Sequence, residues 1–169
     1  MPMTNTRVVL AKRPVGDATS DCFSIETEEL AELERGQVRV AVEYISVDAG
    51  TRTMLRGEGF HQQVGLGETI LAGGVGRIIA SKAEGWEEGQ PVRGGLGAQT
   101  IATVTPKLIE RIDDSVGSLS AHLGVLGGST GVTAWIGIRR VAKPQAGDTF
   151  VGSAAPATGT AGCPDSGMI

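Results

Sequence analysis

The chain has 169 residues, of which 40% are hydrophobic, 4% aromatic and 20% charged, and its formal net charge is -4 at pH 7. This length holds one ordinary domain and the beginning of another. The few aromatic residues and the scattered lysines and arginines argue against a nucleic-acid partner, because neither a stacking surface nor a basic stripe is available.

Cysteine spacing and hydropathy indicate the environment of the protein. Cys22 and Cys163 lie far apart, and neither has a Cys or His at metal-ligand spacing, so no structural zinc is expected. The first residues contain no apolar stretch of signal-peptide length, and no segment approaches the roughly 20 apolar residues that span a membrane. We therefore expect a cytoplasmic protein with free thiols, no metal and no membrane partner.

Short β-prone runs separated by glycine-rich turns occupy the first part of the chain. They cover residues 7–10, 22–27, 38–44, 70–80, 100–104 and 108–112, and a further strand starts near Val92. The clearest run alternates strictly, which places Tyr44 on one face with three valines and predicts that its ring is in the core. The glycines of 73–76 indicate a strand that bends or that another backbone approaches closely. Such repeated short strands are typical of a small β-barrel.

The pattern changes to helical periodicity after Asp113. Ser118 can cap a helix that runs to Leu126, and residues 131–141 form a second apolar helical stretch that ends before Pro144. Two helices are therefore expected to follow the barrel.

The last part of the chain has the character of a phosphate-binding loop. From Gly147 it reads GDTFVGSAAPATG, a short apolar run followed by small residues, as in the first strand and loop of a dinucleotide-binding fold. Seven residues follow Gly162, too few for the helix and strands that complete such a site. We predict a barrel domain over 1–117 and, over 118–169, a helical connector with a truncated remnant of a dinucleotide-binding domain.

Four segments together carry a family resemblance. They are VRVAVEYISVDAGTR (38–52), GGVGRIIAS (73–81), LGVLGGSTGVTAWIG (123–137) and GDTFVGSAAPATG (147–159). In this order they resemble the zinc-independent medium-chain dehydrogenase/reductase family, and within it the alkenal and prostaglandin-type enone reductases. The resemblance implies a mainly β fold with a few helices: a GroES-like β-barrel, two helices and a rudimentary first strand of an α/β unit. It also implies an enone held between barrel and Rossmann domain, and reduction of its C=C bond by NADPH.

Three positions depart from the pattern of the family. Pro156 stands where the phosphate loop has glycine, and it removes an N–H that could face pyrophosphate. Gly50 corresponds to a pocket tyrosine, so the cleft loses a ring and a phenol donor. One extra residue beside Ser129 alters the loop that faces nicotinamide in the family. Together with the short C-terminal segment, these losses favour a protein that uses no cofactor.

Four residues are candidates for catalysis. Asp48 and Arg52 follow the best-predicted strand, where the family places active-site groups. They either orient a polar group or exchange a proton, or they form a structural ion pair, which is the interpretation we favour. His61 lies in a glycine-rich segment and can act as an acid or base near neutral pH, although most isolated loop histidines are solvated. Tyr44 is the sole phenol, and its hydroxyl is expected at the pocket rim.

Five residues are predicted to bind the substrate. They are Gly50, Thr51, Ser129, Thr130 and Trp135. Trp135 stands where the family often has tyrosine, so its ring either lines an apolar cavity or seals a helix against the barrel.

Three functions remain open. We favour a cofactor-independent enzyme, derived from the enone-reductase fold, that binds an apolar unsaturated molecule of polyketide or terpenoid type and promotes cyclisation or isomerisation by confining one reactive conformer. The alternative is a truncated NADPH-dependent enone or quinone reductase that needs the missing Rossmann half, and the third is a non-catalytic small-molecule-binding protein. A homodimer is a further hypothesis, because a second copy would cover the barrel edge that a C-terminal segment completes in the family.

Overall fold

A computed structural model describes residues 3–57 and 62–149 of the protein. The chain divides into two compact units, Met1–Asp113 and Asp114–Ile169. His61 and the predicted phosphate loop with Pro156 lie outside the described residues.

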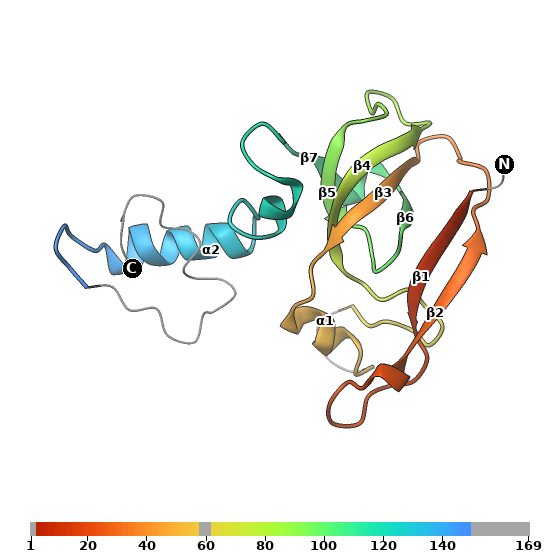
Figure 1. Ribbon diagram of the computed structural model, residues 1–169, viewed down its shortest axis with the longest axis horizontal. Coiled ribbons are helices and arrows are strands. Elements are labelled where there is room, and N and C mark those ends of the chain that lie inside the picture. The colour runs from red at the N-terminus through yellow and green to blue at the C-terminus, as the bar shows by residue number, and fades with distance from the viewer. Residues whose placement is uncertain (1–2, 58–61, 150–169) are drawn as a thin grey trace. The chain divides into compact units, whose positions relative to one another are not determined.

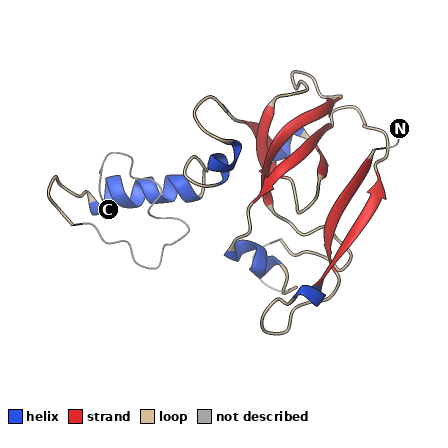
Figure 2. Cartoon of the chain, in the orientation of Figure 1, coloured by secondary structure: helices blue, strands red, loops and turns tan. Residues whose placement is uncertain are grey.

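Two antiparallel sheets build the described part of the first unit (Figure 1, Figure 2). Strand β1 (Thr4–Leu10) pairs with β2 (Phe23–Glu29). The larger sheet has the order β6-β3-β4-β5-β7 and consists of β3 (Val38–Ile45), β4 (Gly73–Ser81), β5 (Pro91–Gly95), β6 (Ile101–Val104) and β7 (Ile109–Arg111). Short 3-10 helices, η1 (Ser20–Cys22) and η2 (Pro106–Leu108), precede β2 and β7. Each predicted run overlaps a strand, and the mainly β fold is confirmed.

Apolar residues on alternating positions of β3 build the core of the larger sheet. Val38 and Val40 are fully buried. They pack in one cluster with Ile78, Val92, Leu96, Ala102, Val104 and Ile109. Burying an aliphatic side chain of this size contributes roughly 1.5–3 kcal/mol. A second cluster comprises Leu10, Leu55, Val64, Ile70 and Ala98.

A bulge in β3 reverses the side of the sheet to which the side chains of its last residues point. In the pairing of β3 with β4, Val42 lies opposite Gly76 and Tyr44 lies opposite Val75, so Glu43 is an extra residue. One inserted residue changes the side of the sheet to which the following side chains point. Tyr44 is accordingly 51% exposed. The prediction that its ring is in the core is wrong.

Gly76 of β4 lies where the backbone of β3 approaches closely. A Cβ atom on Gly76 would stand 2.0 Å from the carbonyl oxygen of Ala41 in β3. Only a residue without a side chain fits at that distance. The predicted close approach is confirmed.

A short helix, α1 (Ala49–Met54), follows β3. The sequence predicts only a loop here, because six residues are too few to show an apolar period. A helix of this length is not stable by itself. It is anchored by Leu55, directly after it, whose side chain is 3% exposed and belongs to the second core cluster.

Residues 114–149, the described part of the second unit, contain three consecutive helical segments. They are the 3-10 helix η3 (Leu119–Leu123), the α-helix α2 (Thr130–Ile136) and the π-helix η4 (Gly137–Ala142). The first predicted helix is thus a single short 3-10 segment, and Ser118 makes no side-chain capping bond there. Helical structure ends at Lys143, which has a left-handed φ of 49°, directly before Pro144 as expected. No helix in residues 3–57 and 62–149 is long and apolar enough to cross a membrane.

Candidate functional site

Asp48 caps helix α1. Its backbone is extended, with φ -133°, and its Oδ1 accepts a hydrogen bond from the Thr51 N–H at 3.1 Å. The Oδ2 atom accepts from the Ser46 hydroxyl at 3.2 Å. Both carboxylate oxygens therefore hold the loop between β3 and α1 in shape.

Arg52 reaches away from Asp48. Its Nη2 donates to the carbonyl oxygen of Gly16, in the turn that follows β1. Its Nη1 is buried and makes no hydrogen bond to any residue that the structure describes. Among the described residues Asp48 and Arg52 form no ion pair with each other, because one caps the helix and the other binds the distant turn. The predicted ion pair is therefore wrong, although each side chain has structural bonds of its own.

Gly50 and Thr51 form the first turn of α1. A Cβ atom on Gly50 would lie 2.9 Å from the Asp48 Oδ1, so any side chain there requires the cap carboxylate to shift. Thr51 is half-buried. Its N–H serves the cap, whereas its hydroxyl has no partner among the described residues. This hydroxyl is therefore available to a ligand.

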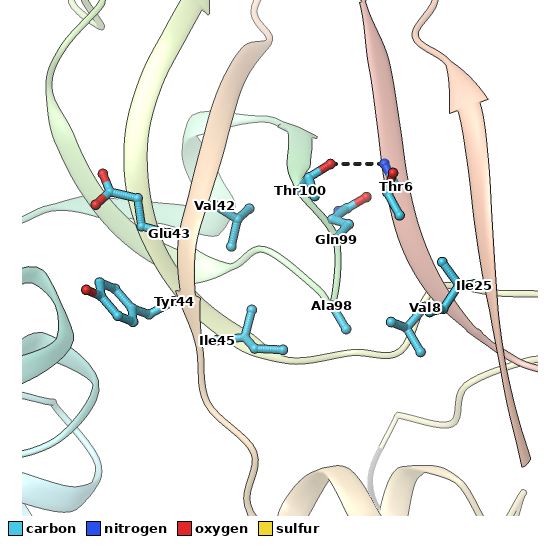
Figure 3. A pocket seen from close by; sticks show the side chains of 10 residues that line it. All are labelled: Thr6, Val8, Ile25, Val42, Glu43, Tyr44, Ile45, Ala98, Gln99 and Thr100. Carbon is cyan, nitrogen blue, oxygen red and sulfur yellow. Dashed lines mark hydrogen bonds between the residues drawn. The ribbon is translucent and has the colours of Figure 1, made fainter. Parts of the chain in front are cut away.

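An open, mainly apolar hollow of about 300 Å³ lies between β1 and β3 (Figure 3). It is lined by Thr6, Val8, Ile25, Val42, Glu43, Tyr44, Ile45, Ala98, Gln99 and Thr100. Two of the lining residues are hydrogen-bonded to each other, because the Thr6 N–H donates to the Thr100 hydroxyl at 2.9 Å. The volume is at the lower end for a small-molecule pocket.

The side chains of β3 beside the hollow divide between the two sides of the strand. Figure 3 shows Val42 and Ile45 projecting toward β1, whereas Glu43 and Tyr44 project to the other side of the strand. The bulge thus leaves the aliphatic side chains to face the hollow.

The remaining predicted substrate residues lie in the second unit, on and before α2. Ser129 precedes the helix without a side-chain capping bond, and Thr130 is its first residue. Trp135 is 48% exposed, and the Arg140 guanidinium lies 5.6 Å from the centre of its ring. Their role in binding stays a prediction.

Four of the predicted site residues are therefore brought together by one short helix and its cap. These are Asp48, Gly50, Thr51 and Arg52. The sequence did not single out Arg13, which binds the far end of the same helix at Leu55. Its only signal is a basic residue in a Lys-Arg-Pro turn, because its partner is 42 residues away in the chain. No group of three or more His, Cys, Asp or Glu in the described part of the chain could hold a metal ion.

The family of the protein that contains this site follows from its similarity to known proteins. A family model described as the N-terminal domain of oxidoreductase matches residues 6–112. The chain belongs to the zinc-independent medium-chain dehydrogenase/reductase family.

Relatives of known name place the chain within this dehydrogenase/reductase family. It is 31% identical to the NADPH-dependent curcumin reductase of Escherichia coli over 94% of this chain and 45% of that protein. It is 30% identical to prostaglandin reductase 1 of Oryctolagus cuniculus over 89% of this chain and 42% of that protein. The crystal structure of CurA from Vibrio vulnificus has 30% identity and a TM-score of 0.71, covering 85% of this chain and 42% of that one.

These matches confirm the enone-reductase resemblance and the GroES-like fold of the N-terminal domain. The chain spans less than half the length of these relatives. The residues that the sequence predicts for a nucleotide's phosphates are not among those described. Dependence on NADPH is stated for the curcumin reductase of Escherichia coli. No geometry of the described residues of this chain bears on a cofactor.

Proposed function

We propose that this chain forms the substrate-binding domain of an NADPH-dependent reductase that acts on small apolar molecules with a C=C bond conjugated to a carbonyl. The observation that carries the proposal is the first turn of α1. There the Thr51 hydroxyl has no hydrogen-bond partner within residues 3–57 and 62–149, while Asp48 and Arg52 make bonds that shape the turn. The NADPH-dependent relative supports the choice of reduction over a reaction without nucleotide.

The chemistry requires a hydrogen-bond donor for the carbonyl oxygen of the substrate. Bound NADPH would supply a hydride to the carbon β to the carbonyl, and solvent would supply a proton to the α carbon. Negative charge develops on the carbonyl oxygen between these events, and in this proposal the Thr51 hydroxyl donates a hydrogen bond to that oxygen. Removal of one such donor lowers kcat on the order of 10²-fold.

The cyclase or isomerase interpretation keeps two supporting features among the described residues, the missing side chain at Gly50 and the extra residue beside Ser129. Its other support, Pro156 and the short C-terminal segment, lies outside them. It remains an outcome of the experiment, as does non-catalytic binding of a small molecule. The homodimer stays a prediction.

The test incubates the full-length natural polypeptide with cinnamaldehyde and with NADPH that carries deuterium at its hydride position. We expect oxidation of NADPH and a saturated aldehyde that carries deuterium at the β carbon. Absence of NADPH oxidation at saturating substrate overturns the proposal. Conversion of a polyene without nucleotide would support the cyclase interpretation instead.

Two variants test the role of the hydroxyl. Thr51→Val keeps the N–H that serves the cap and removes only the hydroxyl, so we expect kcat/KM to fall on the order of 10²-fold. Thr51→Ser restores the donor and is the matched control. Full activity of Thr51→Val would remove Thr51 from the mechanism while leaving the reductase activity in place.

A further inference from the structure

Two arginines join helix α1 to the turn that follows β1, and they reach in opposite directions. Arg13, in the turn, donates to the carbonyl oxygen of Leu55 at the end of α1. Arg52, in α1, donates to the carbonyl oxygen of Gly16 in the turn. The helix is thereby bound to the turn from both sides.

Arg13 binds two backbone carbonyl groups, whereas Arg52 binds one. Its Nη1 donates to the Leu55 carbonyl and its Nη2 to the Val64 carbonyl, each at 3.0 Å. Leu55 and Val64 are 3% and 1% exposed, so few other partners can reach their carbonyl oxygens. The Val64 N–H also donates to the Met54 carbonyl at 3.0 Å. A planar guanidinium can serve two carbonyl groups at once, which a lysine ammonium does less well.

Gly57 leaves the space that this guanidinium occupies. A Cβ atom there would stand 2.7 Å from the Nε of Arg13, and the φ of Gly57 is +84°, which favours glycine. Its N–H donates to the Gln63 side chain at 2.8 Å. The chain on the C-terminal side of α1 is thus shaped around Arg13.

We propose that Arg13 is a positioning residue for the substrate-binding turn of α1. A helix of six residues is not stable in isolation. Its orientation in the protein therefore depends on the contacts at its two ends. Asp48 holds the first end and Arg13 the last. Arg13 therefore sets the direction in which the Thr51 hydroxyl points. That this direction matters for substrate binding rests on the proposed function.

The test compares Arg13→Met and Arg13→Lys with Arg56→Met. Arg56 is exposed, lies beside the same helix and has no side-chain bond among the described residues, so its loss controls for removal of one charge. The first readout is hydrogen exchange of the Thr51 amide, which reports the cap at the opposite end of α1. Global stability is measured in parallel by urea denaturation.

In Arg13→Met we expect exchange at Thr51 to become about tenfold faster relative to amides of β3 and β4. We expect Arg13→Lys to show part of this change and Arg56→Met none. Turnover of cinnamaldehyde should fall roughly 10- to 100-fold in Arg13→Met, in kcat more than in KM, because the substrate is held but misaligned.

Unchanged Thr51 exchange in the Arg13 variants, or an equal change in Arg56→Met, overturns the inference. If Arg13→Met does not fold, Arg13→Lys decides by the same exchange measurement. If the parent protein shows no turnover, the proposed function fails, while the exchange data still decide whether Arg13 orients α1.

Discussion

The position of Asp48 after a strand can be predicted from the sequence. Its hydrogen bonds depend on the backbone that surrounds it in the fold. The sequence predicts its position directly after a strand, and the structure has it there. Its carboxylate accepts from the Thr51 N–H and the Ser46 hydroxyl, which are the bonds of a helix cap. An asparagine side chain offers an equivalent capping acceptor, so the cap alone does not require a negative charge.

Asp48→Asn and Asp48→Ala separate the cap from proton transfer. We expect Asp48→Asn to keep its stability and its turnover of cinnamaldehyde, and Asp48→Ala to lose about 1 kcal/mol of stability in urea denaturation. A loss of turnover on the order of 10³-fold in Asp48→Asn, with normal stability, would instead assign acid or base catalysis to the carboxylate.

At the scale of elements, β3 and β4 show which strand features can be seen in a sequence. Alternation along β3 predicted the buried faces of Val38 and Val40. The bulge at Glu43 was not visible, because it arises from the pairing of β3 with β4 and not from either strand alone. Beyond the bulge the alternation no longer applies, which is why the facing of Tyr44 could not be predicted.

Gly76, opposite the bulged part of β3, is expected to be intolerant of any side chain. A Cβ atom there would meet the Ala41 carbonyl oxygen at 2.0 Å, and this contact is with backbone that cannot move aside alone. We expect Gly76→Ala to lose about 3 kcal/mol in urea denaturation. Gly73→Ala, on the same strand, would meet only the Ser46 Cβ at 3.9 Å and is the control. Equal denaturation midpoints for the two variants would contradict the close approach.

At the scale of the whole first unit, Asn5 connects the two sheets. Its side chain is 1% exposed. The Nδ2 donates to Gln99 at 2.9 Å and to Glu28 at 3.3 Å. The Oδ1 accepts from the Ile101 N–H at 3.0 Å and from the Thr100 hydroxyl at 3.2 Å. One buried amide thus bonds β2, the start of β6 and the residues before it.

Asn5→Leu tests this connection. The substitution leaves the Ile101 N–H without its acceptor in a buried place, so we expect a loss of about 2–4 kcal/mol in urea denaturation. Thr27→Val, on the exposed face of β2, should change stability by less than about 0.5 kcal/mol. A midpoint for Asn5→Leu as high as that of Thr27→Val would show that the sheets are held by apolar packing alone.

The sequence by itself determined the set of strands, the mainly β fold, the two helical segments after Asp113 and the family. These follow from local patterns: alternation, turn residues and short motifs extend over a few neighbouring positions. Only the tertiary structure decided the side of the sheet to which Tyr44 points, the capped helix α1 and the long-range hydrogen bonds of Asn5 and Arg13. Those two side chains have partners up to 96 and 51 residues away, and no local pattern encodes a bond across such a separation.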